Sequence, residues 1–141
     1  MKKFIVFAFS VASTLLSAQS VTGQLTFVDR LGGLVLNYPQ GDTLRAKVVD
    51  ADRNLSSTAL DTLSVRFSSE KETSGEKITF TETGVNTGVF TASMLFSETT
   101  AVAADGVLQV DRGNKLTGTY VDPADDFGNT TSQTATSFYG L

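Results

Sequence analysis

The chain has 141 residues, with 11 basic and 15 acidic side chains and a formal net charge of −4, and it contains no cysteine, histidine or tryptophan. The lack of cysteine and histidine excludes disulfide bonds and the Ser–His and Cys–His pairs of covalent hydrolases. The negative charge disfavours nucleic acids and anionic lipids as partners.

Residues 1–20 have the pattern of a secretory signal peptide. A lysine pair is followed by an apolar stretch at 4–16 and by small residues at 17–20, as a signal peptidase requires. The apolar stretch is shorter than the roughly 20 residues that span a bilayer, so we expect cleavage after Ala18 or Ser20 rather than a retained anchor. The protein is therefore predicted to be secreted or at the cell surface, or periplasmic in transit, with no membrane span in the mature chain.

Residues 21–141 are predicted to form one domain, long enough to bury a core without covalent cross-links. Without Lys2 and Lys3 the count falls from 11 to 9 basic residues against 15 acidic ones, a net charge of −6. An exported domain without disulfide bonds has to obtain its stability from packing or from bound metal, and a negative surface suits cations.

Beyond residue 20 the sequence alternates between apolar and polar residues and shows no helical period. Leu63, Val65 and Phe67, for example, alternate with polar side chains, as in a half-buried antiparallel strand. Gly- and Asn-containing turns separate such runs. The predicted strands are, in chain order, 23–28, 34–38, 43–49, 61–67, 76–81, 88–96, 107–110, 115–121 and 130–138. Seven to nine such strands predict an all-β, antiparallel, immunoglobulin-like β-sandwich, with a small barrel as the alternative.

Asp50, Asp52 and Asn54 place three oxygen-bearing side chains at alternate positions directly after the strand predicted at 43–49. Calcium takes roughly six to eight oxygen ligands, and neighbouring carboxylates repel one another unless a cation lies between them. These residues are therefore candidate calcium ligands. The alternative is an Asx turn, in which the side chains bond only to local amides. The segment is not an EF-hand, because it lacks the central glycine and the final glutamate of that loop.

Further acidic residues stand at the ends of predicted strands. Glu82 and Asp122 follow strands and Asp61 begins one, so all three are expected at the same end of the domain as Asp50. They are candidate calcium ligands, with solvated turn residues as the alternative.

The acidic loop at residues 122–129 also contains Asp125 and Asp126. Its oxygen atoms suit a second ion, and a solvated loop is the alternative. Phe127 is expected to plug the underside of this loop, with an exposed aromatic contact as the alternative.

The stretch from Gly84 to Phe90 predicts a tight turn. Gly84 and Gly88 suit left-handed backbone positions, after which Val89 or Phe90 enters the core. The stretch is not a phosphate-binding loop, because the Lys-[Ser/Thr] pair and the following helix are missing.

Six motifs in order resemble a β-sandwich module that occurs in tandem in very large bacterial and archaeal surface proteins. The motifs are GQLTFVD at 23–29, YPQGD at 38–42, VVDADRN at 48–54, TFTETGVNTGVF at 79–90, DGVLQV at 105–110 and YVDPADD at 120–126. The resemblance covers nearly all of the chain after residue 20. It implies an extracellular, calcium-stabilised structural or adhesive module without catalytic activity. A single module departs from the tandem arrangement, which raises the hypothesis that the chain rebuilds the array non-covalently.

The segment 21–38 is predicted to govern assembly. It contains two β-rich runs, and an apolar strand near a chain end can pair within its own sheet or add to the open edge of a neighbour. The second arrangement is head-to-tail and grows into a filament of identical subunits.

These features together predict a calcium-stabilised structural module that self-assembles into an extracellular fibre, tubule, surface layer or matrix. The alternative is a monomeric adhesion module that binds a surface glycan or protein, with Tyr120, Phe127 and Tyr139 as candidate aromatic contacts. We expect no enzyme, no catalytic residue and no organic cofactor. The composition permits the carboxylate pair of a glycosidase, but the acids lie in turns and so small a domain offers no obvious cleft.

Overall fold

The computed structural model describes residues 20–141. The predicted signal peptide lies outside the described residues, apart from Ser20. Within residues 20–141 the chain is all-β except for one 3-10 turn, η1, at Ala51–Arg53. No helix in this part of the chain is long and apolar enough to cross a membrane.

Eight strands form the fold, and each coincides with a predicted strand to within two residues at either end. They are β1 Gln24–Phe27, β2 Thr43–Val49, β3 Thr62–Ser69, β4 Glu76–Glu82, β5 Val89–Ser97, β6 Val107–Gln109, β7 Lys115–Asp122 and β8 Thr131–Phe138.

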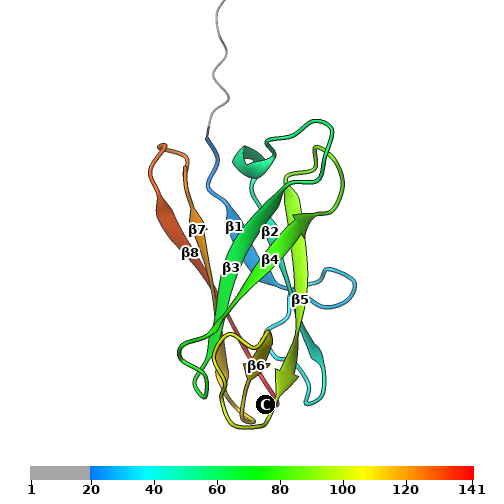
Figure 1. Ribbon diagram of the computed structural model, residues 1–141, viewed down its shortest axis with the longest axis vertical. Coiled ribbons are helices and arrows are strands. Elements are labelled where there is room, and N and C mark those ends of the chain that lie inside the picture. Colours follow the sequence, from blue (N-terminus) through cyan, green and yellow to red (C-terminus); the bar gives the residue numbers. More distant parts are fainter. Residues whose placement is uncertain (1–19) are drawn as a thin grey trace, which may run out of the picture.

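The strands form one sheet that is nearly closed. Its order is β1-β2-β5-β4-β3-β7-β8, with antiparallel neighbours throughout, and β6 adds to β5 in parallel. The sheet curls until its edge strands, β1 and β8, lie beside each other, as can be followed in Figure 1. No ladder pairing joins β1 to β8 in the described part of the chain. The all-β, antiparallel prediction is confirmed, and the sheet retains an opening between β1 and β8.

Aromatic side chains from several elements meet in the core. The ring centroid of Phe67 lies 5.5 Å from that of Phe27 and 6.1 Å from that of Phe80. The ring centroids of Phe27 and Tyr38 are 6.2 Å apart. Aromatic pairs at such distances stabilise a core beyond their buried area. The alternation predicted for β3 is confirmed, because Leu63, Val65 and Phe67 are buried and the side chains between them are exposed.

The strand predicted at 34–38 is wrong. Only two isolated bridges occur there, Leu34 with Val28 and Tyr38 with Tyr139. The segment changes partner along its length: Val35 N bonds to Phe27 O of β1, whereas Tyr38 N bonds to Phe138 O of β8. It crosses from one edge strand to the other and therefore builds a ladder with neither.

The turn between β4 and β5 partly follows its prediction. Gly88 takes a left-handed conformation (φ 61°), but the second left-handed residue is Asn86 (φ 63°) and not Gly84. Asparagine tolerates this region better than most residues. A Cβ on Gly88 would lie 3.1 Å from Ala51 Cα, so glycine also permits the turn to approach η1. Phe90 enters the core as expected.

Replacing Tyr38 with phenylalanine is expected to lower the free energy of unfolding by about 1–3 kcal/mol, because the hydrogen bonds between its hydroxyl and backbone groups would be lost. The Tyr38 hydroxyl lies 2.6 Å from Arg45 O and 3.0 Å from Val28 O, and burial raises the pKa of Tyr38 to about 12. Urea unfolding measures the change. Leu36→Ala, at a side chain that is 65% exposed, is the control and should stay within about 0.5 kcal/mol. Equal stability of Tyr38→Phe and the native chain would contradict this role.

Candidate functional site

The structure brings every predicted calcium ligand to one end of the sheet. At this end the described chain begins, and η1, the β4–β5 turn and the β7–β8 loop lie beside it (Figure 1). The predicted ligands there are Asp50, Asp52, Asn54, Asp61, Glu82, Asp122, Asp125 and Asp126. They fall into separate hydrogen-bonded groups. No three acidic side chains of residues 20–141 are grouped as a ready-made cage for one ion.

Three of the acids hold the segment that leads into β1. The amides of residues 21–23 donate in turn to the carboxylates of Asp52, Asp126 and Asp122, each at 2.7 Å. These acceptors come from η1, from the β7–β8 loop and from the end of β7. Three of the predicted calcium ligands therefore also anchor the N-terminal segment. The sequence contains no local pattern for this arrangement, because the partners are 31 to 104 positions apart.

Asp50 is fully buried beneath this anchor. Its carboxylate accepts from the Asp52 amide at 2.9 Å and from the Tyr120 hydroxyl at 2.5 Å. The first bond caps η1 and agrees with the Asx-turn alternative. Burial raises the pKa of Asp50 and the nearby Asp122 carboxylate adds to this, although the Tyr120 hydroxyl opposes it. A buried anion next to a second anion favours an added positive charge.

The side-chain oxygen of Asn54 is a second feature of this end of the sheet. This Oδ1 is buried and has no hydrogen-bond partner in the structure. An unsatisfied buried acceptor costs about 1–3 kcal/mol, and coordination to an ion removes that cost. The unsatisfied oxygen of Asn54 and the raised pKa of Asp50 both agree with the prediction that these residues bind calcium. When bound, calcium would supply the positive charge that these side chains lack.

Glu82 and Asp61 accept hydrogen bonds from backbone amides of neighbouring turns. Glu82 accepts from the amides of Thr87 and Gly88 at 2.7 and 2.8 Å and from the Asp61 amide at 3.2 Å. Asp61 accepts from the amides of residues 55 and 56 at 2.6 and 2.7 Å. Burial alone raises the pKa of Glu82, but the donors at Gly88, Asp61 and Thr87 together lower it below its ordinary value. Both residues close turns, which agrees with the turn alternative for them.

The expectation that Phe127 plugs its loop is wrong. Its side chain is 88% exposed. The buried carboxylate of Asp125 fills the loop instead and accepts from the amides of Phe127 and Asn129, each at 2.9 Å. Tyr120 and Tyr139 are both buried, so Phe127 alone of the three candidate aromatic contacts reaches the surface.

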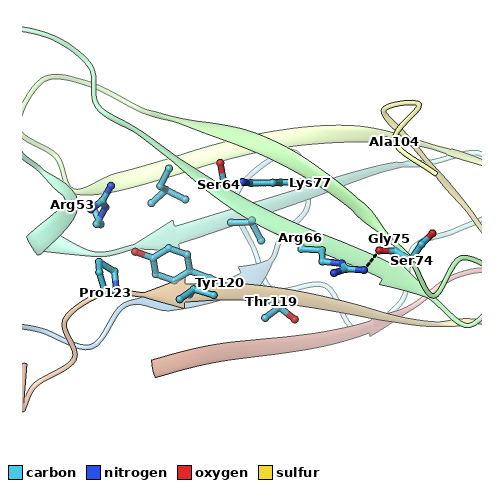
Figure 2. A pocket seen from close by; sticks show the side chains of 13 residues that line it. Arg53, Ser64, Arg66, Ser74, Gly75, Lys77, Ala104, Thr119, Tyr120 and Pro123 are labelled. Atoms are coloured by element: carbon cyan, nitrogen blue, oxygen red, sulfur yellow. Dashed lines mark hydrogen bonds between the residues drawn. The ribbon is translucent and has the colours of Figure 1, made fainter. Parts of the chain in front are cut away.

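A groove on the outer face of the sheet was not predicted. It encloses about 790 Å³ between β3, β4 and β7, and Figure 2 shows Arg53, Arg66 and Lys77 along it. Arg66 and Lys77 stand directly opposite each other on β3 and β4, and like charges so placed are unfavourable without an anion between them. Arg66 also donates to Ser74 O. The three cations come from separate segments, which is why no local sequence pattern indicates the groove.

Neither the models of known protein families nor the curated proteins contain a match to this chain. The resemblance to the tandem surface module therefore rests on the six motifs alone.

Glu82→Gln is expected to destabilise the protein at neutral pH and to make its stability less dependent on pH. Because the folded pKa of Glu82 lies below the ordinary value of 4.5, its contribution is present above that value and is lost as pH falls through the lowered one. Urea midpoints at pH 7 and in acid measure both effects. Glu70→Gln, an exposed acid at the other end, is the control. Parallel pH profiles for Glu82→Gln and the native chain would contradict the assignment.

Proposed function

We propose that this chain is an exported, immunoglobulin-like structural module that self-assembles through its N-terminal strand under the control of calcium. Its product would be an extracellular fibre, tubule, surface layer or matrix. The observation that carries the proposal is that Asp52, Asp122 and Asp126, three predicted calcium ligands, are also the anchor of residues 21–23. Any ion that engages these carboxylates acts on the segment that holds β1 in place.

The open side of the sheet supports exchange of strands. β1 has four residues, pairs only with β2, and faces β8 without ladder pairing in the described chain. Unpaired strand edges are templates for another chain. A strand from a neighbour that occupied this side would make a head-to-tail contact, which propagates instead of closing.

Exposed apolar side chains support contact between copies. Leu31, Leu34 and Leu36, between β1 and β2, are 85%, 67% and 65% exposed. Phe127 lies at the end where the described chain begins, and the exposed Leu141 lies at the opposite end, as Figure 1 shows for the β7–β8 loop and the C-terminus. Leu31, Leu34 and Leu36 are close in sequence, and neighbouring exposed apolar groups are typical of interaction surfaces. The positions of Phe127 and Leu141 at opposite ends suit head-to-tail association.

Calcium and anchoring of the N-terminal segment are expected to be coupled. A carboxylate oxygen that turns to an ion weakens its bond to the amide of residue 21, 22 or 23. Coupling between two binding events is reciprocal, so release of the segment strengthens calcium binding at these acids. Calcium would thereby raise the fraction of chains whose β1 is free to exchange.

The protein purified after export, with its N-terminal residue identified by mass spectrometry, is expected to grow into large particles in millimolar calcium and to return to monomers with excess chelator. Light scattering measures the growth. Asp52→Asn combined with Asp126→Asn should abolish it, since an amide oxygen still accepts an N–H but lacks the negative charge that a carboxylate offers to calcium.

Glu70→Gln combined with Glu98→Gln, at exposed acids far from this end that belong to neither ion pair of residues 20–141, is the matched control and should assemble like the native chain. A native chain that stays monomeric at high concentration in calcium rules the proposal out.

The outer groove favours a second function, adhesion to an acidic polysaccharide or protein. Arg53, Arg66 and Lys77 line it, and none of the lining residues within 20–141 is acidic, so an anionic ligand is favoured there despite the negative net charge. Stacking on a neutral sugar has little support, because among the aromatic candidates only Phe127 is exposed.

For this second function, Arg66→Gln combined with Lys77→Gln should weaken binding of a polyuronate by about tenfold at low salt, as expected when one or two charge contacts are lost. Surface plasmon resonance at two salt concentrations measures the affinity. Lys47→Gln combined with Lys115→Gln removes the same charge elsewhere and should leave the affinity nearly unchanged. Equal losses in both variants would show that only net charge matters.

A further inference from the structure

Two buried carboxyl groups lie at the end of the molecule remote from the predicted calcium ligands. Glu72, in the turn between β3 and β4, is 1% exposed, and Glu76, the first residue of β4, is 2% exposed. Figure 1 places this turn beside β6, at the end that holds the C-terminus. Neither residue belongs to the six motifs or to the predicted sites.

Backbone amides from the loop before β6 and from β6 satisfy part of this pair. Glu76 accepts from Gly106 N at 2.9 Å and from Asp105 N at 3.3 Å, and Glu72 Oε2 accepts from Gln109 N at 2.9 Å. Glu72 Oε1 is buried and has no hydrogen-bond partner in the structure. An acceptor oxygen in a buried acidic pair is therefore available to a ligand.

Within residues 20–141 no basic side chain forms an ion pair with Glu72 or Glu76. The ion pairs found in residues 20–141 are Arg45 with Asp42 and Lys71 with Asp111, and neither involves Glu72 or Glu76. Burial raises the pKa of Glu72, and the carboxyl groups of Glu76 and then Asp105 raise it further, while the Gln109 amide lowers it. Two adjacent buried carboxylates cannot both remain charged unless a cation joins them.

We propose that Glu72 and Glu76 hold a divalent cation of the size and hardness of calcium, which fastens the 98–106 loop to the β3–β4 turn. Two carboxylates match the charge of such an ion. Calcium accepts carbonyl oxygens and water as its remaining ligands in a flexible geometry, whereas magnesium demands a near-ideal octahedron. The exposed loop gives the ion a path to the site.

The conformation of the loop agrees with a clamped segment. Ala104 has a left-handed backbone (φ 61°), which is unfavourable for alanine and persists where the surroundings impose it. The two amides that follow it, of Asp105 and Gly106, are those that Glu76 binds. An ion bound to Glu72 and Glu76 would hold the Glu76 carboxylate in place. The carboxylate would in turn hold the strained turn at Ala104 through its two amide hydrogen bonds.

Titration of the uniformly ¹⁵N-labelled exported chain with calcium chloride tests the site by NMR. The amide signals of Gly106 and Gln109 are expected to shift and saturate at millimolar calcium. These amides lie at the opposite end from those of residues 21–23, so failure of this site and failure of the calcium-linked assembly give different spectra. Unchanged Gly106 and Gln109 signals at saturating calcium overturn the proposal.

Glu72→Gln tests the site because its effect on stability should change sign between chelator and calcium. In chelator the variant should be at least as stable as the native chain, because an amide relieves the repulsion from Glu76. In calcium the native chain should be the more stable of the two, because only it gains from the ion. Thermal unfolding under both conditions measures this, with Glu70→Gln on the same turn as the control.

If the difference in unfolding temperature between the native chain and Glu72→Gln is the same in calcium as in chelator, the two carboxyl groups share a proton and hold no ion. That result would overturn the site. If Glu72→Gln does not fold, Glu76→Gln and the NMR titration of the native chain decide.

Discussion

Buried carboxylates that accept hydrogen bonds from loop amides tie the connections of this domain to its sheet. Asp122 holds the Gly23 amide across 99 positions of sequence, Glu82 holds the turn before β5, and Glu76 holds the loop before β6. Bonds from an amide to a charged oxygen are stronger than those between neutral groups. In a chain without cysteine they perform the cross-linking that disulfide bonds provide in many exported domains. Both ends of the sheet thereby depend on carboxylates, whose charge changes with pH.

These acids divide by what surrounds them. Where several amides and the Thr87 hydroxyl donate to one carboxylate, as at Glu82, the pKa falls and the charged form is stabilised. Where burial is combined with a nearby second acid, as for Asp50 beside Asp122 and Glu72 beside Glu76, the pKa rises. Orphaned oxygens occur near both raised groups, at Asn54 and at Glu72. Each carboxylate with a raised pKa thus occurs together with a side-chain oxygen that has no hydrogen-bond partner. This coincidence favours the proposal of two cation sites rather than one.

Local sequence patterns account for most of the fold. Alternation between turn residues predicts the eight strands, most of which have one buried face. The acids at the ends of several of these strands lie at one end of the sheet, as expected. The partners of those acids are not predictable in this way. Whether Asp122 meets an ion or the Gly23 amide depends on how a distant segment folds back. The same applies to residues 34–38, whose apolar residues indicate a strand although the segment crosses between two edges. It also applies to Phe127, which Asp125 displaces from the loop interior. The burial of Glu72 and Glu76 is not predictable from the local sequence, because it depends on the loop at 98–106.

The way in which β1 is held limits how copies of this chain can associate. β1 has four paired residues with β2, whereas β2 and β5 share seven pairs, so the acids that bind residues 21–23 supply a large part of its anchorage. Its side chains are nevertheless part of the core, since Phe27 is 1% exposed and packs on Phe67. Withdrawal of such a phenylalanine leaves a cavity that costs about 3–5 kcal/mol. A strand that takes the place of β1 must therefore refill that space with a side chain of the same shape. The β1 strand of an identical chain does so without loss, which favours exchange between copies of this protein over capture of an unrelated strand.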